Sequence, residues 1–114
     1  MVKINAKKQR RINEAMQLLD NSYRKDVNSI RINVGNTISH EVAKLKVVYR
    51  LIKEGKLCYT EAVFKNGARA DIYVPEDFRV FEILHSETEA EALSKKDYYP
   101  FELDIVLIKS CEVD

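Results

Sequence analysis

Two acidic side chains stand in segments that otherwise have the pattern of apolar strands. In residues 67–87, GARADIYVPEDFRVFEILHSE, Asp71 interrupts the first apolar run and Glu82 interrupts the second. Because successive strand residues point to opposite faces, and no face here is polar throughout, both strands are expected to be covered. A carboxylate in such a place is costly unless it is paired or binds a cation. Two acids on neighbouring strands therefore suggest a metal site.

A third candidate acid lies in the strongest helix signal of the chain, residues 37–54. Asn36 or Thr37 can cap the start of this helix, and Gly55 suits a left-handed residue at its end. A stripe of apolar residues at helical spacing predicts its buried face: Ile38, Leu45, Val48 and Ile52.

Glu41 falls inside that predicted stripe, three residues after Ile38. Two interpretations remain open. Glu41 pairs at the rim with Lys44 or a neighbouring arginine and stabilises the first turn, or it faces the same cavity as Asp71 and Glu82. His40 is turned about 100° away on a helical wheel, so we expect it at the surface or in contact with a substrate.

Residues 57–64, LCYTEAVF, have the pattern of a strand, and the following Lys-Asn-Gly is a hairpin turn signal. This strand carries Glu61. Either Glu61 lies near the other acids, or it pairs across the hairpin with Arg69.

The last third of the sequence predicts a helix and one more strand. Ser86 and Glu89 form a capping box for a helix that runs to about Asp97, and Pro100 stops it. Residues 101–108, FELDIVLI, are nearly all apolar, so we expect a central strand. A crossover helix would make this strand parallel to the preceding one, after a three-strand meander.

The N-terminal region predicts an amphipathic helix over residues 3–20 whose first half is basic, with Lys7, Lys8, Arg10 and Arg11. Positive charge there opposes the helix dipole, so the cluster either contacts nucleic-acid phosphates or is a solvated face. Residues 29–34 alternate as a short strand does, with Arg31 and Asn33 outward if the isoleucines face the core.

Composition sets wide limits. The 114 residues make one domain, and 19 basic against 18 acidic residues give a net charge of +1. Any DNA binding must therefore come from a local patch. The sequence holds no apolar run of membrane-spanning length and no signal peptide, so an intracellular protein is expected. Cys58 and Cys111 lack metal-ligand spacing and are expected to be reduced packing thiols, although a disulfide is possible in a hyperthermophile.

The order helix, three strands, helix, strand, with one acid in the helix, Asp71 in the second strand and Glu82 in the third, resembles the PD-(D/E)XK nuclease superfamily. That family includes archaeal Holliday junction resolvases and small viral nucleases. The resemblance implies an α/β, restriction-endonuclease-like αβββαβ core in residues 36–114, a mixed sheet flanked by helices. Residues 1–35 would add a basic N-terminal helix and a connecting segment.

Carried over by position, the resemblance implies that Asp71, Glu82 and the main-chain carbonyl of Ile83 ligate Mg²⁺ or Mn²⁺, with Glu41 contributing from the helix. Oxygen donors alone suit these ions. The implied activity is metal-dependent cleavage of DNA. A homodimer is expected as well, because a domain this small reaches both strands of a duplex most readily as a pair.

This chain departs from the family pattern at two positions. The family lysine, two residues after the third-strand acid, is here Leu84, and the proline before the strand aspartate is Ala70. Some members carry the lysine on the following helix, where Lys95 and Lys96 stand, and Lys96 lies nearer the apolar stripe. Three hypotheses follow: an active nuclease, a catalytically silent member that binds nucleic acid or protein, and an unrelated α/β interaction protein.

Overall fold

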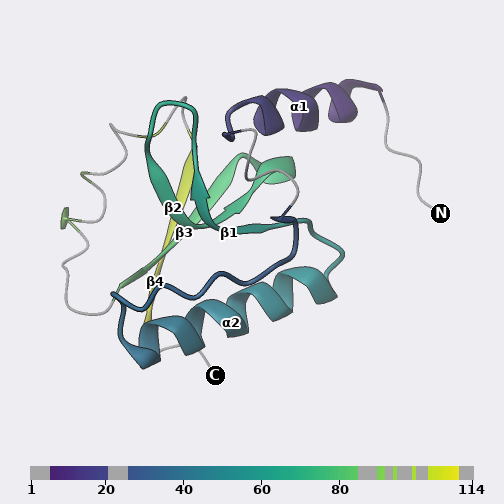
Figure 1. Cartoon of the computed structure of the whole chain (residues 1–114). Helices are drawn as coiled ribbons and strands as arrows, with labels where there is room; N and C mark the ends of the chain where they lie inside the picture. Colours follow the sequence, from purple (N-terminus) through teal and green to yellow (C-terminus); the bar gives the residue numbers. More distant parts are fainter. Residues whose placement is uncertain are drawn as a thin grey trace.

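The structure is a computed structural model that describes residues 6–20, 26–84, 90, 91, 94, 99 and 103–110. In these residues the fold is α/β, with two α-helices and a four-stranded mixed sheet (Figure 1). The elements are α1 (Ala6–Gln17), α2 (Ile38–Lys53), β1 (Tyr59–Val63), β2 (Arg69–Val74), the short 3₁₀ helix η2 (Pro75–Asp77), β3 (Arg79–Leu84) and β4 (Asp104–Lys109).

The sheet has the strand order β1-β2-β3-β4. The first three strands form an antiparallel meander, and β4 is parallel to β3, as the sequence predicts. The expectation that the last strand is central is wrong, because β4 lies at an edge and its middle residues are only half-buried. An unbroken apolar run indicates that both faces of a strand are partly covered. It does not indicate whether the strand lies in the centre of the sheet or at its edge.

The two helices cover opposite faces of the sheet, so the chain forms two cores (Figure 1). On the α1 face, Ala15 and Leu19 pack with Tyr73 and Val80. The Tyr73 hydroxyl donates a hydrogen bond to the main-chain oxygen of Ala15 at 2.9 Å, and burial raises the pKa of this tyrosine. On the α2 face the helix packs against the sheet through a second apolar cluster that includes Val48, Ile72 and Ile83.

Local signals place α2 within one residue of its predicted bounds. The Thr37 hydroxyl accepts a hydrogen bond from the main-chain nitrogen of His40 at 3.2 Å and caps the helix. Gly55 follows the helix with φ of 84°, and Gly67 has φ of 90° in the β1–β2 turn. Both are left-handed conformations that glycine adopts without a steric penalty.

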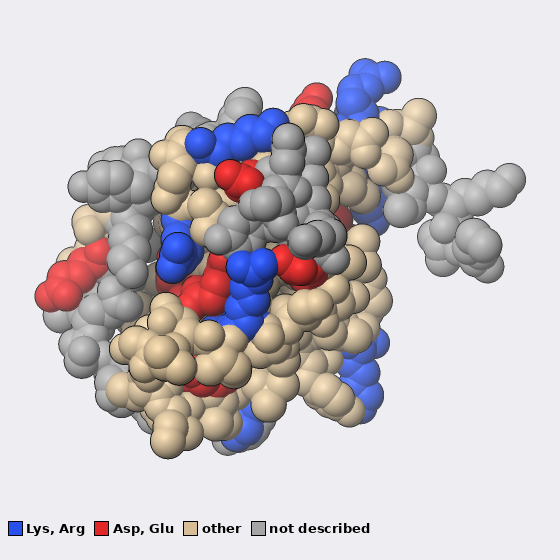
Figure 2. Space-filling model, viewed as in Figure 1, with Lys and Arg blue, Asp and Glu red and all other residues tan. Residues whose placement is uncertain are grey.

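The predicted buried stripe of α2 is confirmed for Val48 and Glu41 but is wrong for its other members. Ile38 is 84% exposed, and Leu45 and Ile52 are about half exposed at 48% and 41%. The face that packs on the sheet instead carries Ala43, Lys44, Val47, Val48 and Leu51, together with His40 and Glu41. Figure 2 accordingly shows a broad uncharged surface in the lower part of the molecule, where α2 lies in Figure 1. Both faces of this helix carry enough apolar residues to pack against a core. The helical spacing of these residues alone does not show which face is buried.

Residues 29–33 run beside β1 but form no strand. The Thr60 hydroxyl donates to the main-chain oxygen of Ser29 and accepts from the main-chain nitrogen of Arg31, both at 2.8 Å. The Thr60 side chain thus takes the place of the main-chain hydrogen bonds that would pair a strand with β1. The expected inward orientation is also wrong for Ile32, which is 64% exposed.

Cys58 is a free, buried thiol whose pKa burial raises to about 11. Its expected reduced state agrees with this environment, whereas Cys111 lies outside the described residues. The helix predicted over residues 86–97 also falls mostly outside them. Across the described part of the chain, neither helix has the length and apolar character needed to span a membrane.

Candidate active site

Three acids meet in one row of the sheet. On β2, Ile72 has a ladder partner on β1 and another on β3. One residue earlier, the same registers place Glu61 opposite Asp71 and Asp71 opposite Glu82. The predicted neighbourhood of Asp71 and Glu82 is therefore present, and Glu61 lies in the same row. The structure shows no ion pair between Glu61 and Arg69.

The backbone is distorted at this row. Glu61 has φ of 46°, a left-handed conformation that is uncommon for residues other than glycine. On the next strand, the Asp71 carboxylate accepts a hydrogen bond from the main-chain nitrogen of Ile83 at 2.8 Å, a donor that regular pairing would direct to a carbonyl. Such local strain persists only where surrounding structure enforces it, and it is common at functional sites.

Asp71 and Glu82 lie next to each other, and the Glu82 side chain is among the groups that lower the pKa of Asp71. Glu82 is 3% exposed, so the two carboxyl groups are shielded from water. Neighbouring buried carboxylates are costly unless a positive charge compensates them, so the pair is a candidate site for a cation.

His40 connects this pair to the helix. Its Nε2 lies 3.4 Å from Oδ2 of Asp71, and its Nδ1 lies 3.1 Å from Oε1 of Glu41. The expectation of a surface histidine is wrong, because His40 is only 7% exposed. The hydrogen bond to Asp71 raises the pKa of His40 above 6.5 despite the opposing effect of burial. Burial would raise the pKa of Asp71, but the bonds from His40, Ile83 and Glu82 hold it below 3.8.

Lys44 is completely buried, and the sequence indicated it only as a rim partner for Glu41. Its Nζ lies 2.6 Å from Oε2 of Glu41 and donates to the main-chain oxygen of Arg31 at 2.6 Å. The same nitrogen lies 3.7 Å from Oε1 of Glu61. Lysine is almost never fully buried unless it is paired, so Lys44 forms one buried cluster with Glu41 and Glu61. The available signal was its spacing of three residues from Glu41 on one helix face.

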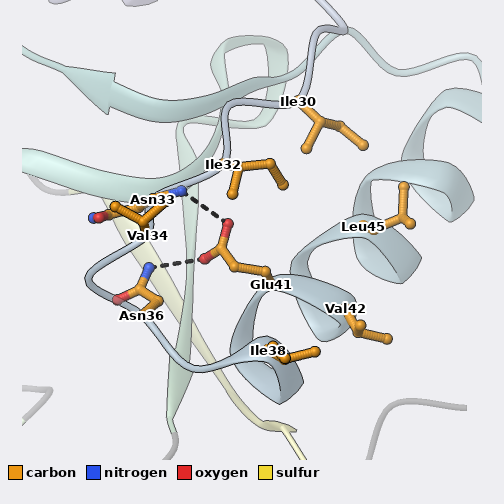
Figure 3. A pocket seen from close by; sticks show the side chains of 9 residues that line it. All are labelled: Ile30, Ile32, Asn33, Val34, Asn36, Ile38, Glu41, Val42 and Leu45. Atoms are coloured by element: carbon orange, nitrogen blue, oxygen red, sulfur yellow. Dashed lines mark hydrogen bonds between the residues drawn. The ribbon is translucent and has the colours of Figure 1, made fainter.

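The pairing of Glu41 with Lys44 is confirmed, although the pair is buried rather than at the rim. Glu41 also contacts His40, whose ring lies between it and Asp71, so a cavity shared directly with Asp71 and Glu82 is not seen. Its carboxylate further accepts hydrogen bonds from the main-chain nitrogen of Asn33 at 3.2 Å and from the Asn36 side chain at 2.8 Å (Figure 3). Burial would raise the pKa of Glu41, but these donors hold it below 4.5.

The donors present fit a divalent cation at Asp71 and Glu82 but not at Glu41. Carboxylate oxygens suit Mg²⁺ or Mn²⁺, and the main chain of Ile83 lies directly against Asp71. Glu41, in contrast, is separated from Asp71 by the His40 ring and neutralised by Lys44. Among the described residues no group of three or more His, Cys, Asp or Glu side chains has the arrangement of a metal site.

Of the other predicted residues, only the basic cluster of α1 lies within the described part of the chain. Lys95 and Lys96 lie outside the described residues. The basic cluster Lys7, Lys8, Arg10 and Arg11 is exposed on α1, which covers the opposite face of the sheet from α2. There the Arg11 guanidinium lies 5.0 Å from the ring centre of Phe78.

Comparison of the chain with protein-family models, with curated proteins and with solved structures yields no match in any of the three.

Proposed function

We propose that this protein is a metal-dependent nuclease that cleaves DNA phosphodiester bonds on a restriction-endonuclease-like fold. The observation that carries the proposal is the placement of Asp71 and Glu82 on adjacent strands, with His40 of α2 against Asp71. Lys44 of the same helix lies near Glu61 on the neighbouring strand. Buried acids that share a site, with perturbed pKa values, are typical of functional sites.

Asp71 and Glu82 would hold the cation, together with the main-chain carbonyl of Ile83. When bound, Mg²⁺ or Mn²⁺ would polarise the scissile phosphate and lower the pKa of an attacking water. Carboxylates bind a cation only when they are deprotonated, so binding is expected to strengthen as the pH rises. Protonated His40 beside Asp71 competes with the cation for the same carboxylate.

Lys44 contributes positive charge to the site from the helix. The side chain of Leu84, at the position of the family lysine, can neither donate a hydrogen bond nor carry a charge, whereas Lys44 places an ammonium group against Glu41 and Glu61. Because Lys44 is completely buried, we assign it the role of holding these two carboxylates in place rather than of contacting the phosphate. Lys96 remains the candidate for stabilising negative charge at the reacting phosphate.

DNA would also need contacts outside the carboxylate row. The exposed basic cluster of α1 is proposed to bind the phosphate backbone, which predicts a salt-dependent affinity. A homodimer would let two such chains engage both strands of a duplex.

A second candidate function is nucleic-acid binding without cleavage. It is favoured by Leu84 and by the engagement of Glu41, which is held by Lys44, Asn33 and Asn36 rather than turned toward Asp71. A carboxylate that is held by an ion pair and hydrogen bonds in this way can stabilise the fold without taking part in catalysis.

Cleavage of linear, single-stranded and branched DNA in Mn²⁺ or EDTA tests the proposal, with wild type beside Glu82→Gln. The exposed Glu54→Gln serves as a matched control with the same charge change. Cleavage that requires Mn²⁺ and survives only in wild type and Glu54→Gln is expected. Binding without cleavage would establish the silent alternative, and neither binding nor cleavage would exclude both.

A further inference from the structure

The outward face of α2 carries a continuous apolar stripe. Its side chains expose 84%, 41%, 48%, 62% and 41% of their surface, in the order Ile38, Val42, Leu45, Tyr49 and Ile52. The successive spacings of four, three, four and three residues are those of a coiled-coil seam. A helix that buries a glutamate and a lysine while it leaves such a seam exposed is unlike an ordinary surface helix.

A groove widens the stripe at the N-terminal half of α2. It is about 570 Å³ in volume and lies between the helix and the extended segment before it (Figure 3). That segment adds Ile32 and Val34, which are 64% and 95% exposed. The groove is lined by Ile30, Ile32, Asn33, Val34, Asn36, Ile38, Glu41, Val42 and Leu45.

We propose that this face binds the same face of a second copy of the chain, with the two α2 helices antiparallel about a two-fold axis near Leu45. The face is self-complementary, because its N-terminal half is hollow and its C-terminal half carries the large exposed side chain of Tyr49. A two-fold axis places the Tyr49 of each subunit at the groove of the other, so the same contact forms twice.

The exposed apolar area is large enough for this occupant. The five stripe residues with Ile32 and Val34 are each 41–95% exposed, which for seven large residues is several hundred Å², on the order of the roughly 800 Å² that one partner contributes to a standard-size interface. A second copy carries the same patch, so two such faces can cover each other.

The dimer would place both carboxylate sites beside the interface. Glu41 lines the groove on one side and contacts His40 and Lys44 on the other. Dimerisation does not depend on the proposed nuclease activity, however. Glu82→Gln is expected to lose cleavage and remain dimeric, so failure of one proposal leaves the other intact.

Sedimentation velocity across a concentration series tests the interface directly. Wild type is expected to sediment as a dimer, and Leu45→Glu and Tyr49→Glu are expected to sediment as monomers that retain the circular dichroism of wild type. Leu57→Glu is the matched control, because Leu57 is 53% exposed but lies outside the stripe. A wild-type monomer at every concentration, which would leave the face to some other partner, overturns the proposal, as does a dimer unaffected by Leu45→Glu.

Disulfide trapping tests the antiparallel geometry, in a Cys111→Ser background where the remaining Cys58 is buried. Leu45→Cys is expected to cross-link to its own copy. Ile38→Cys is expected not to, because seven residues at 1.5 Å each separate it from the axis on either side, which puts the two copies about 21 Å apart. A mixture of Ile38→Cys and Ile52→Cys is expected to cross-link. Trapping of Ile38→Cys with itself would overturn the antiparallel arrangement.

Discussion

The two faces of α2 reverse the usual distribution of side chains on a surface helix. The inward face presents His40, Glu41 and Lys44 to the acids of the sheet, while the outward face presents Ile38 and Leu45 to the surroundings. Charged groups become buried only where partners satisfy them, and exposed apolar side chains gain nothing until another surface covers them. The charged groups of the inward face therefore find their partners within one chain, whereas the apolar side chains of the outward face would need a second surface to cover them.

The largest effect is expected from removing the inward cation. Lys44→Met should reduce the free energy of unfolding by about 3–5 kcal/mol, because it leaves the Glu41 carboxylate buried beside a neutral side chain. Urea denaturation measures this loss. The outward neighbour Leu45→Met is the control and should change stability by less than about 0.5 kcal/mol in the monomeric Tyr49→Glu background. Equal losses would contradict the contrast between the faces.

The next largest effect on folding stability is expected from His40, and it should depend on pH. Its raised pKa means that its contribution is complete below 6.5, the ordinary histidine value, and is lost as the pH rises through the folded-state value. Glu41 and Asp71 have lowered pKa values, so their contributions are complete above 4.5 and 3.8 and are lost on acidification. Stability should therefore be greatest between about pH 4.5 and 6.5.

His40→Asn provides the corresponding test. It should remove the decline of stability above pH 6.5 and cost about 1.5–3 kcal/mol at pH 5.5, the range for hydrogen bonds to charged groups. Thermal denaturation at a series of pH values measures both effects. An unchanged profile would place the pH response elsewhere in the chain.

The cap of α2 supports both faces and should have a moderate effect. Thr37→Ala removes the oxygen that accepts a hydrogen bond from His40, which should cost about 1 kcal/mol. Thr37→Ser keeps the cap and should remain within a few tenths of a kcal/mol of wild type. Chemical denaturation of the three proteins compares them, and a loss in Thr37→Ser equal to that in Thr37→Ala would argue against a capping role.

The smallest effect is expected at the outermost apolar residue. Ile38→Ser should change the stability of the monomeric Tyr49→Glu variant by less than about 0.5 kcal/mol, because Ile38 is almost fully exposed within one chain. In the otherwise wild-type chain it should weaken dimerisation instead. A large loss in the monomer would show that this side chain packs within its own subunit.

Local signals were sufficient to predict most of the elements. The cap at Thr37, the left-handed Gly55 and the turn at Gly67 mark ends that the structure places at or next to the predicted residues. The proximity of Asp71 to Glu82 followed from strand alternation and the meander. These features depend on residues close together in the sequence or on adjacent strands.

The orientation of α2 and the role of Lys44 could not be predicted in the same way. Val42 and Leu45 on one face are as apolar as Val47 and Leu51 on the other, so periodicity could not choose between them. The inward face is the one that packs against Ile72 and Ile83 of the sheet and brings Lys44 to Glu61, seventeen residues further along the chain, and no local pattern encodes these contacts.

The parallel placement of β4 has a consequence for folding. The residues of the carboxylate cluster lie between His40 and Glu82, so all of them precede β4 in the chain. The strand β4 starts only at Asp104, twenty residues after β3 ends at Leu84, and no residue of the cluster comes from it. During synthesis the cluster and its meander are expected to form first, and β4 is expected to join a sheet whose chemistry is already in place.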